Sequence, residues 1–390
     1  MKASKPHRKH AKLARPALGR FGRCEWAIMG IPSETIQGLV RQLSVELGSR
    51  YKLAYATADD KDADEPVSND HEQSSILAHA GTFEYTDKIN FHRIDFEAHL
   101  QDHQFRMLFN DQDLILVNGN HLRAARQIVV VDARKENALW KQSDRLTDVQ
   151  LFLLAQEAHE IPSYLKEVID NWSEVPVLKL SDVAAIAAFL KQQMNMLRPP
   201  LAGLVLAGGK SQRMGRDKGL LEYYGKPQRD HMMALVKQHC KETYLSVRPG
   251  QLAAKEAFVL EDTFIGLGPF GAIASAFRHD PNRAWLVAAV DLPLLDKATL
   301  DQLVAGRNPS KLATAFKSPH NAFPEPLMSI WEPRAYPVLL NYLAQGHSSP
   351  RKVLIDSDVE LLDIEREEAL TNVNHPEEFE GIMKQLGKSG

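Results

Sequence analysis

The sequence predicts an α/β protein with two doubly wound domains, and three observations support this class. The chain has 390 residues, which is enough for two domains of ordinary size. Apolar β-like runs alternate with amphipathic stretches in both halves, as expected for sheets covered by helices. The segment Arg198-Pro199-Pro200 separates a helix-like stretch from a new apolar run. We therefore expect domains over residues 24–198 and 201–390.

In the first domain, four apolar runs predict the strands of a parallel sheet. These are Trp26–Ile31, Leu53–Thr57, Leu114–Asn118 and Ile128–Asp132. Helices are expected after Pro32, around Asp148–Ala158 and over Ser181–Leu197, with Ser181 as the N-cap of the last. The acidic stretch from Asp59 to Ser75 could chelate a cation, but we interpret it as a solvated loop, because a cation site also needs backbone carbonyls in a defined turn.

The second domain shows the same alternation of strands and helices. The predicted strands are Leu204–Ala207, Thr243–Val247, Phe258–Leu260, Trp285–Ala289, Leu312–Ala315 and Leu327–Trp331. The predicted helices are Gln228–Cys240, Pro269–Arg278, Thr299–Ala305, Pro333–Ala344 and Pro376–Leu386.

Composition excludes several classes of protein. With 44% hydrophobic and 25% charged residues, the chain lies in the globular range and is neither collagen-like, wholly disordered nor a coiled coil. No apolar run approaches the roughly 18 to 20 residues of a membrane helix. Cys24 and Cys240 lie far apart with no CxxC spacing, so we expect neither a disulfide framework nor a cysteine zinc site. A reducing cytoplasm with no membrane contact fits these features best.

The first 23 residues form a basic segment, with eight Lys and Arg and no acidic residue, although the whole chain has a net charge of −3. Such a tail could bind nucleic acid. It has no interleaved aromatic side chains apart from Phe21, however, and no basic module follows it. The apolar core of a secretory signal is also missing. We predict a disordered tail over residues 1–23 and no nucleic-acid partner.

The segment from Leu204 to Lys218 carries the most chemical information. An apolar strand leads into the pair Gly208-Gly209, and the cations Lys210, Arg213 and Lys218 follow. Glycines let backbone N–H groups approach phosphate oxygens, and the cations neutralise phosphate charge, so the loop can hold a triphosphate. It is not a Walker A loop, because the first glycine of that motif would fall at Leu204, inside the strand. The alternative is a basic surface loop after a buried strand.

The motif Leu206-Ala-Gly-Gly-x-x-x-Arg213-Met-Gly-x-Asp217-Lys218-x-Leu220-Leu221 resembles the signature of the molybdenum cofactor guanylyltransferases, which are MobA-like nucleotidyltransferases. Four further matches follow in the family's order: Tyr224-Gly-Lys-Pro227, Gly268-Pro-Phe-Gly271, Asp291-Leu-Pro293 and Asn372-Val-Asn-His-Pro-Glu377. The resemblance covers residues 201–387. It implies a Rossmann-like, nucleotide-diphospho-sugar-transferase-like fold and the transfer of GMP from Mg-GTP to the terminal phosphate of molybdopterin or Mo-molybdopterin, with release of pyrophosphate.

The resemblance also implies site residues. The catalytic residues would be Arg213, Lys218 and Asp291. The nucleotide would contact Leu206, Ala207, Gly208, Gly209, Lys218, Asp262 and Asp291. The acceptor would contact Ser349, Arg351, Lys352, Asn372 and Asn374, although the hydroxyls and cations of this group could instead cap a helix.

Asp291 is the expected Mg²⁺ ligand, with Asn374 as a second one. Asp291 follows the apolar run Trp285–Val290, and the carboxyl end of a strand is where open α/β sheets bind ligands. Asp291 could instead cap the turn at Pro293, and Asn374 could belong to an ordinary turn. No serine, cysteine or histidine nucleophile is needed, because the attacking group is the phosphate monoester of the substrate, already anionic near neutral pH.

The specificity for GTP depends on two positions. The carboxylate of Asp262 could accept from N1–H and N2–H₂ of guanine, or it could cap a turn. The segment Ser246-Val247-Arg248 departs from the family, which commonly presents an asparagine to the base there. A CTP-dependent cytidylyltransferase or another NTP transferase, such as a sugar-1-phosphate nucleotidyltransferase, therefore stays open. A non-catalytic cofactor-binding adaptor is the alternative of another class, but the intact Lys218 and Asp291 argue against it.

The first domain resembles a degenerate MobB-like GTP-binding adaptor. Trp26-Ala-Ile-Met-Gly30 is a strand that ends in glycine before a helix. At the position of the Walker A Gly-Lys-Ser/Thr, however, the chain has Thr35-Ile36-Gln37, with no lysine for the phosphates. We predict a scaffold that hydrolyses no nucleotide. The partners it implies are molybdoenzyme apoproteins or other cofactor-synthesis proteins.

Overall fold

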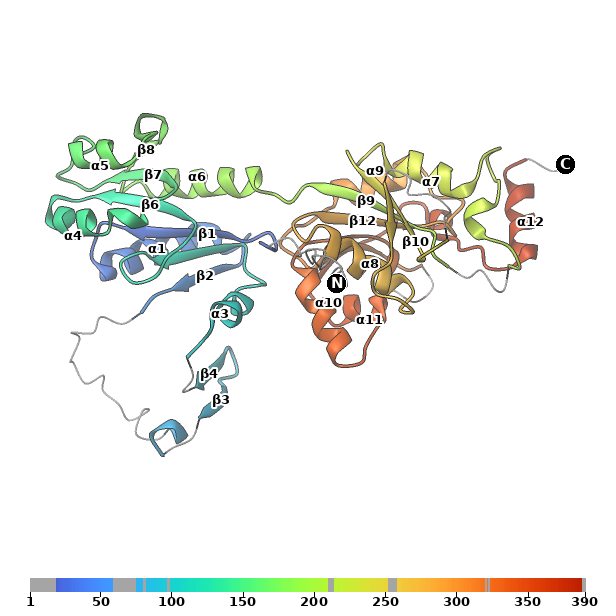
Figure 1. Ribbon diagram of the computed structural model, residues 1–390, viewed down its shortest axis with the longest axis horizontal. Helices are drawn as coiled ribbons and strands as arrows, with labels where there is room; N and C mark the ends of the chain where they lie inside the picture. The colour runs from blue at the N-terminus through green and yellow to red at the C-terminus, as the bar shows by residue number, and fades with distance from the viewer. Residues whose placement is uncertain are drawn as a thin grey trace, which may run out of the picture. The chain divides into compact units, whose positions relative to one another are not determined.

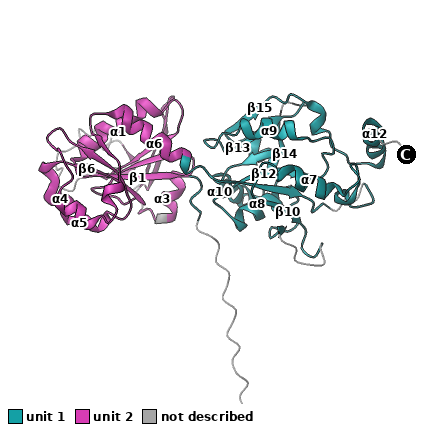
Figure 2. Ribbon diagram, turned by 90° about the horizontal axis from the view of Figure 1, so that it is seen from above, with its two compact units in different colours: residues 1–22, 196–390 teal, residues 23–195 magenta. Residues whose placement is uncertain are grey.

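The structure is a computed structural model, drawn in Figure 1. It describes residues 19–58, 75–79, 82–96, 99–209, 214–251, 258–319, 321 and 323–387. Most of the basic tail, nearly all of the acidic stretch and the loop residues 210–213 lie outside the described residues. The chain divides into an N-terminal unit, Arg23–Asn195, and a C-terminal unit that contains Met196–Gly390 (Figure 2).

The N-terminal unit is built on a six-stranded sheet in the order β2-β5-β1-β6-β7-β8. Every neighbouring pair in it is parallel, as predicted. The sequences of these strands are nearly continuous apolar runs because helices cover both faces of the sheet. Their bounds are β1 Cys24–Met29, β2 Leu53–Ala56, β5 Leu114–Asn118, β6 Arg126–Val131, β7 Val149–Leu154 and β8 Val177–Lys179.

Figure 2 shows α1 and α6 on one side of this sheet and α4 and α5 on the other. Met29, Val129 and Phe152 pack in one core cluster with Leu139 of α4 and Leu165 of α5. The sheet is therefore doubly wound, which confirms the predicted class. The helices are α1 Ser33–Leu47, α3 Asp102–Leu108, α4 Glu136–Lys141, α5 Ser163–Val168 and α6 Val183–Met196.

Two local predictions in this unit are wrong. The stretch Asp148–Ala158 contains strand β7, not a helix, and β7 pairs with β6 and β8. Periodicity cannot separate a short buried strand from a buried helix, and neighbouring strands decided this one. Ser181 is not the N-cap of α6, because the Asp182 carboxylate accepts the backbone N–H of Ala185 at 3.0 Å.

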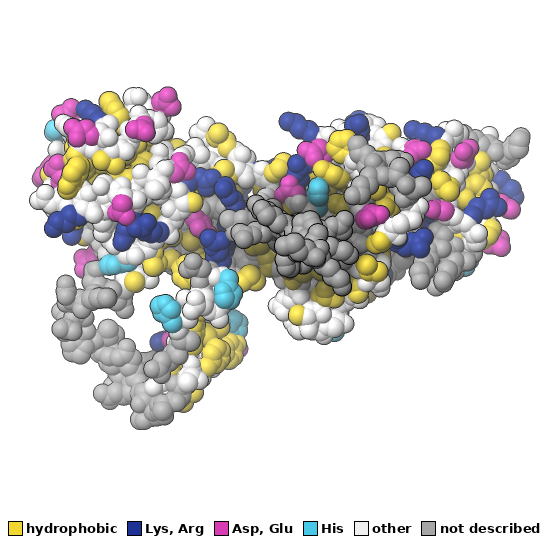
Figure 3. All heavy atoms as spheres, in the orientation of Figure 1, with side chains coloured by type: hydrophobic (Ala, Val, Ile, Leu, Met, Phe, Trp, Pro, Cys, Tyr) yellow, Lys and Arg dark blue, Asp and Glu magenta, His cyan; other side chains and the backbone are white. Residues whose placement is uncertain are grey.

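A two-stranded antiparallel ribbon, β3 Phe83–Asp87 with β4 His92–Phe96, also belongs to the N-terminal unit. Phe83, Tyr85 and Ile94 on the ribbon are exposed, as is Phe91 beside it. Figure 3 shows apolar side chains gathered over these strands. The ribbon therefore presents more apolar surface than isolated exposed residues would.

The C-terminal unit has a seven-stranded sheet in the order β11-β10-β9-β12-β14-β13-β15. β14 is antiparallel to β12 and β13, and the other pairs are parallel. All six predicted strands form, with ends shifted by up to three residues. The bounds are β9 Leu201–Leu206, β10 Thr243–Val247, β11 Val259–Glu261, β12 Ala284–Ala289, β13 Ala313–Lys317, β14 Pro324–Trp331 and β15 Val359–Leu362.

Alternate side chains of β12 enter two cores. Leu286 and Ala288 pack with residues of α7 and α9, and Trp285 and Val287 pack with residues of α8, α10 and α11. This sheet too is doubly wound. Beyond it, α12 contributes Ile382 to a smaller cluster. The helices are α7 Gln228–Val236, α8 Pro269–His279, α9 Lys297–Ala305, α10 Ala335–Ala344, α11 Pro350–Ile355 and α12 Pro376–Gln385.

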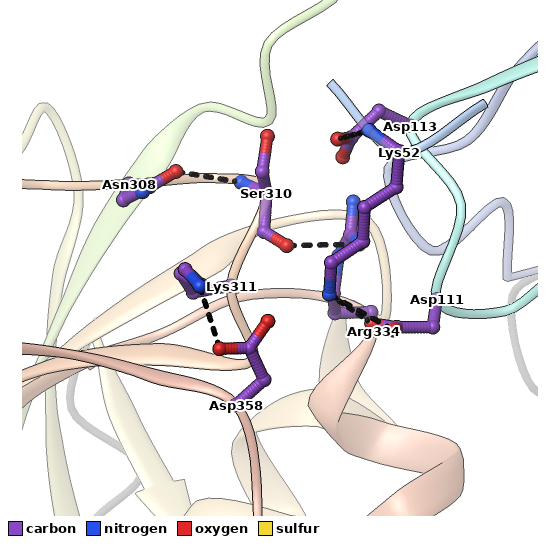
Figure 4. A network of polar contacts seen from close by, with 8 residues as sticks. All are labelled: Lys52, Asp111, Asp113, Asn308, Ser310, Lys311, Arg334 and Asp358. Atoms are coloured by element: carbon purple, nitrogen blue, oxygen red, sulfur yellow. Dashed lines mark hydrogen bonds and ion pairs between the residues drawn. The ribbon is translucent and has the colours of Figure 1, made fainter. Parts of the chain in front are cut away.

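Polar contacts at the beginnings of parallel strands align each sheet (Figure 4). In the C-terminal unit, the ammonium of Lys311 lies 2.6 Å from Asp358 Oδ1, just before β13 and β15. In the N-terminal unit, the backbone N–H of Lys52 donates to Asp113 Oδ2 at 2.9 Å, just before β2 and β5. Among the described residues, no helix is long and apolar enough to cross a membrane.

Candidate active site

A cavity of about 840 Å³ lies at the carboxyl ends of the central strands of the C-terminal unit. Its walls include residues at or just after the ends of three strands and residues between β11 and α8. The strand-end residues are Leu206–Gly209 at β9, Ser246, Arg248 and Pro249 at β10, and Val290 and Asp291 at β12. The chain runs from β9 to β10 and β11 on one side, and β12 lies on the other side of β9. The cavity therefore lies where the strand order reverses, the usual ligand site of a doubly wound sheet.

Three predicted residues meet at one end of this cavity. The ammonium of Lys218 donates to Asn374 Oδ1 at 2.7 Å and lies 3.5 Å from Asp291 Oδ2. Lys218 belongs to the short helical turn η5, Lys218–Leu220, whose first backbone N–H groups are capped by Asp217. Burial raises the pKa of Asp291, while the charge of Lys218 opposes this rise. We call Lys218, Asp291 and Asn374 the phosphate-end cluster.

The phosphate-end cluster fits the Mg²⁺ that the resemblance implies. Asp291 Oδ1 is buried and accepts no hydrogen bond from another described residue, which leaves one carboxylate oxygen for a ligand. Asn374 adds an amide oxygen to the same place. The described residues contain no group of three or more His, Cys, Asp or Glu that could hold a metal. Mg²⁺ does not need one, since it is commonly bound by one or two carboxylates with waters and substrate phosphates.

The other end of the cavity holds a polar pair, of which one residue is buried and the other half-buried. The hydroxyl of Ser246 is fully buried at the end of β10 and donates to Asp262 Oδ1 at 2.8 Å. Burial raises the pKa of Asp262 to about 6, although the bond from Ser246 works in the opposite direction. We call Ser246 and Asp262 the base-end pair. The pairing was not predicted, because nothing in the sequence sets the register of β10 against β11.

Gln251 connects the loops around the cavity and was also missed from the sequence. Its side-chain Nε2 donates to the carbonyl of Ala207 at 3.0 Å and to Asp217 Oδ2 at 3.4 Å. Asp217 in turn accepts the backbone N–H of Gly219 at 2.9 Å. This chain of bonds fixes the loop after β9 relative to the turn that carries Lys218. A lone glutamine after a Pro-Gly turn belongs to no motif, so the sequence gives no indication of this role.

The structure places the predicted acceptor residues differently. Ser349 is the N-cap of α11 and accepts the backbone N–H of Lys352. Lys352 pairs with Asp356 at 2.7 Å, and Arg351 lies 3.5 Å from Glu325. Neither these three residues nor Asn372 line the cavity. Their acceptor role stays a prediction. Arg213, predicted to be catalytic, lies outside the described residues. Leu206, Ala207, Gly208 and Gly209 line the cavity, and their contact with a nucleotide stays a prediction.

A doubly wound sheet with a Lys-Asp-Asn cluster and a Ser-Asp pair in one cavity at its switch point is typical of nucleotide-binding α/β proteins. Comparisons with known proteins identify the family. Residues 203–361 match the model of the MobA-like NTP transferase domain. The chain is 32% identical over 195 residues to the molybdenum cofactor guanylyltransferase of Pseudomonas putida. The matched region covers 47% of this chain and 97% of that protein. The chain belongs to the MobA-like NTP transferase family and is a nucleotidyltransferase.

Two other similar proteins differ in how much of their own length the match covers. The molybdenum cofactor biosynthesis bifunctional protein of Synechocystis sp. is 32% identical over 188 residues, which make up 47% of this chain. This chain therefore spans about half of that protein's length, 54%. The solved structure of molybdopterin-guanine dinucleotide biosynthesis protein A from Archaeoglobus fulgidus matches 48% of this chain and 100% of its own, with 24% identity and a TM-score of 0.42.

Proposed function

We propose that the C-terminal unit transfers GMP from Mg-GTP to the terminal phosphate of molybdopterin. The observation that carries this proposal is a single cavity with the phosphate-end cluster at one end and the base-end pair at the other. That arrangement suits a nucleoside triphosphate, with its phosphates beside Lys218 and its base beside Asp262. The relative in Pseudomonas putida is named a molybdenum cofactor guanylyltransferase, which supports the choice of donor and acceptor.

The reaction needs no protein nucleophile. An oxygen of the molybdopterin phosphate attacks the α-phosphorus of GTP, the bond from that phosphorus to the bridging oxygen breaks, and pyrophosphate leaves with that electron pair. The product is a diphosphate that joins molybdopterin to GMP. Lys218 neutralises charge on the phosphates, and the cavity orients donor and acceptor, so catalysis consists of positioning and electrostatic stabilisation. Held by Asp291 and Asn374, Mg²⁺ would supply further positive charge to the phosphate oxygens.

The base-end pair favours guanine over cytosine. An ionised Asp262 accepts hydrogen bonds only, and guanine offers N1–H and N2–H₂ side by side. Cytosine places the acceptors N3 and O2 at the corresponding edge, which a carboxylate repels. The segment Ser246-Val247-Arg248 departs from the family, which commonly presents an asparagine there, and the Ser246 hydroxyl holds the Asp262 carboxylate in place. The pair thus supports GTP as the donor.

The same proposal assigns the N-terminal unit a non-catalytic role in a cytoplasmic enzyme. Helix α1 begins at Ser33 and carries Thr35-Ile36-Gln37 where a Walker A loop would have its lysine and hydroxyl. This unit would serve as a scaffold for molybdoenzyme apoproteins or other cofactor-synthesis proteins. Tests of donor and acceptor chemistry therefore concern the C-terminal unit.

The donor is tested by thermal unfolding of the full chain with Mg²⁺ and GTP, CTP, ATP or UTP. We expect GTP to stabilise most, by about 2.7 kcal/mol at a hundred times its Kd. Transfer to molybdopterin is then followed chromatographically. Asp291→Asn should lower kcat by roughly 100- to 1000-fold without loss of fold, while Asp301→Asn on the exposed side of α9 should leave it unchanged. A preference for CTP would support cytidylyl transfer instead, and no nucleotide binding would support a cofactor-binding adaptor.

A further inference from the structure

Arg248 is a charged residue of the cavity that the proposed reaction has not yet used. It follows β10 directly and lines the cavity beside the base-end pair. Its backbone N–H donates to Gln251 Oε1 at 3.0 Å, and Gln251 also bonds to the carbonyl of Ala207 at 3.0 Å. The backbone of Arg248 is therefore fixed against the loop that follows β9.

Arg248 and Asp262 border the same space above Gly208. A Cβ atom on Gly208 would lie 3.4 Å from Asp262 Oδ2 and 3.5 Å from Arg248 Cγ. These are ordinary contact distances, so Asp262 and the stem of Arg248 both lie against Gly208 in the cavity wall. The two residues follow neighbouring strands, β10 and β11, and a ligand in the cavity can reach both.

The Arg248 guanidinium and one carboxylate oxygen of Asp262 make no polar contact with another described residue. The structure gives no ion pair between Arg248 and Asp262, and no described carboxylate pairs with the Arg248 guanidinium. Ser246 occupies Asp262 Oδ1, and no described residue donates to Oδ2. A cavity wall therefore carries one acceptor and one set of donors that are both available to a ligand.

Guanine has the complementary pattern on adjacent atoms. Its O6 and N7 accept hydrogen bonds, and its N1–H and N2–H₂ donate them. Arginine commonly binds guanine through O6 and N7, in a bidentate geometry that its planar guanidinium allows. Adenine puts an amino group in place of O6, which a cation repels. The combination of Arg248 with Asp262 therefore distinguishes guanine from the other bases at two edges.

We propose that Arg248 is a specificity-determining residue, which selects guanine by donating hydrogen bonds to O6 and N7 while Asp262 accepts from N1–H and N2–H₂. This inference rests on the proposed use of GTP. It adds a second contact with the base, from a residue to which the family resemblance assigned no role. It would also account for a preference for GTP in a chain whose segment Ser246-Val247-Arg248 departs from the family.

The test is calorimetric titration of the full chain with three Mg-bound triphosphates: GTP, ITP, and 2-aminopurine riboside triphosphate, which lacks both O6 and the N1–H, so the role of Arg248 is judged from the change that Arg248→Ala makes to each affinity. The wild-type chain should bind GTP and ITP more tightly than the 2-aminopurine analogue. Arg248→Ala should weaken GTP and ITP by roughly tenfold and the analogue much less. Arg248→Lys should keep part of the preference. Arg278→Ala removes an exposed arginine of α8 and should change nothing.

The outcomes separate this inference from the proposed function. If the wild-type chain does not prefer GTP, the proposed function fails and the role of Arg248 with it. If the wild-type chain prefers GTP but Arg248→Ala binds it equally well, only the role of Arg248 is overturned. Equal weakening of all three triphosphates by Arg248→Ala also overturns it, because a contact with phosphate or a loss of fold would act in that way.

Discussion

At the scale of one residue, the proposed contact of Asp262 with guanine predicts that nucleotide binding depends on pH. Its pKa is raised to about 6 by burial, so it becomes protonated as the pH falls through 6. A neutral carboxylic acid cannot accept from both N–H groups of guanine. We expect the Kd for GTP to be constant above pH 7 and to rise about tenfold per unit well below 6. Calorimetric titrations with GTP at pH values from 5 to 8 would measure this change in Kd.

Two variants distinguish the effect of the Asp262 carboxylate on the pH dependence from the effects of other titrating groups, including the phosphates of GTP. Asp262→Asn should bind GTP weakly and lose the pH dependence. Ser246→Ala removes the hydrogen bond that lowers the pKa of Asp262, so the loss of affinity should begin at a higher pH. If Asp262→Asn retained the wild-type pH profile, another group would be responsible for it.

The same carboxylate should cost the free protein stability at neutral pH. Because its pKa is higher in the folded chain than the usual 3.8, the folded state binds more protons than the unfolded state between these values. Its contribution to stability is present below about pH 4 and is lost as the pH rises through 6. Asp262→Asn should therefore raise the Tm of the nucleotide-free chain at pH 7.5, and by less at pH 5. A lower Tm at both pH values would contradict this.

The phosphate-end cluster could be predicted from the sequence, and the base-end pair could not. Asp291 follows an apolar strand, and Lys218 and Asn374 belong to ordered motif matches, so their convergence at one sheet edge was expected. The bond from Ser246 to Asp262 and the role of Gln251 depend on how β10 and its following loop lie against β11 and β9. Strand register and loop path are set by packing of the whole sheet, which no short motif encodes.

At the scale of elements, a buried ion pair joins the end of α9 to the end of β14. Arg307 and Glu332 form two bonds, at 2.6 and 2.9 Å, with side chains 6% and 1% exposed. Glu332→Ala leaves an uncompensated buried guanidinium and should lower the free energy of unfolding of the C-terminal unit by about 3–5 kcal/mol. Urea unfolding followed by circular dichroism measures the change.

The matched control for this pair lies on the same helix. Lys297 and Asp301 form an exposed pair at 2.6 Å, one turn apart on α9. Lys297→Ala should cost no more than about 1 kcal/mol, because solvent screens the pair and both side chains lose entropy in forming it. Equal losses in Glu332→Ala and Lys297→Ala would mean that burial does not set the strength of the first pair.

Element prediction failed where tertiary neighbours decide the outcome. β7 was expected to be helical, yet its apolar residues pair with strands on both sides. α11 and β15 were missed, since α11 has only six residues and β15 four, both too short for a clear periodicity. The long strands β9 and β12 were recognised because each carries a continuous apolar run that two helix layers cover.

At the scale of the whole molecule, each unit has its own sheet, and the cavity lies entirely in the C-terminal one. Every described residue that lines the cavity falls between Leu206 and Asn374. Arg23–Asn195 contributes none of them. The site therefore depends on one folding unit, and a nucleotide site in the other unit would have to be independent of it.

The N-terminal unit should not provide a second GTP site. Its cavity of about 540 Å³ at the start of α1 is lined by Glu34 as well as Lys135, and Ser33 there bonds to His121 at 3.2 Å. The carboxylate opposes the cation, and the Walker A lysine and hydroxyl are replaced by Ile36 and Gln37. Calorimetry on the full chain should give one GTP per chain, and residues 196–390 alone should bind GTP with a Kd within about twofold of that value. Two sites per chain, or loss of binding in the shorter chain, would assign nucleotide binding to the N-terminal unit as well.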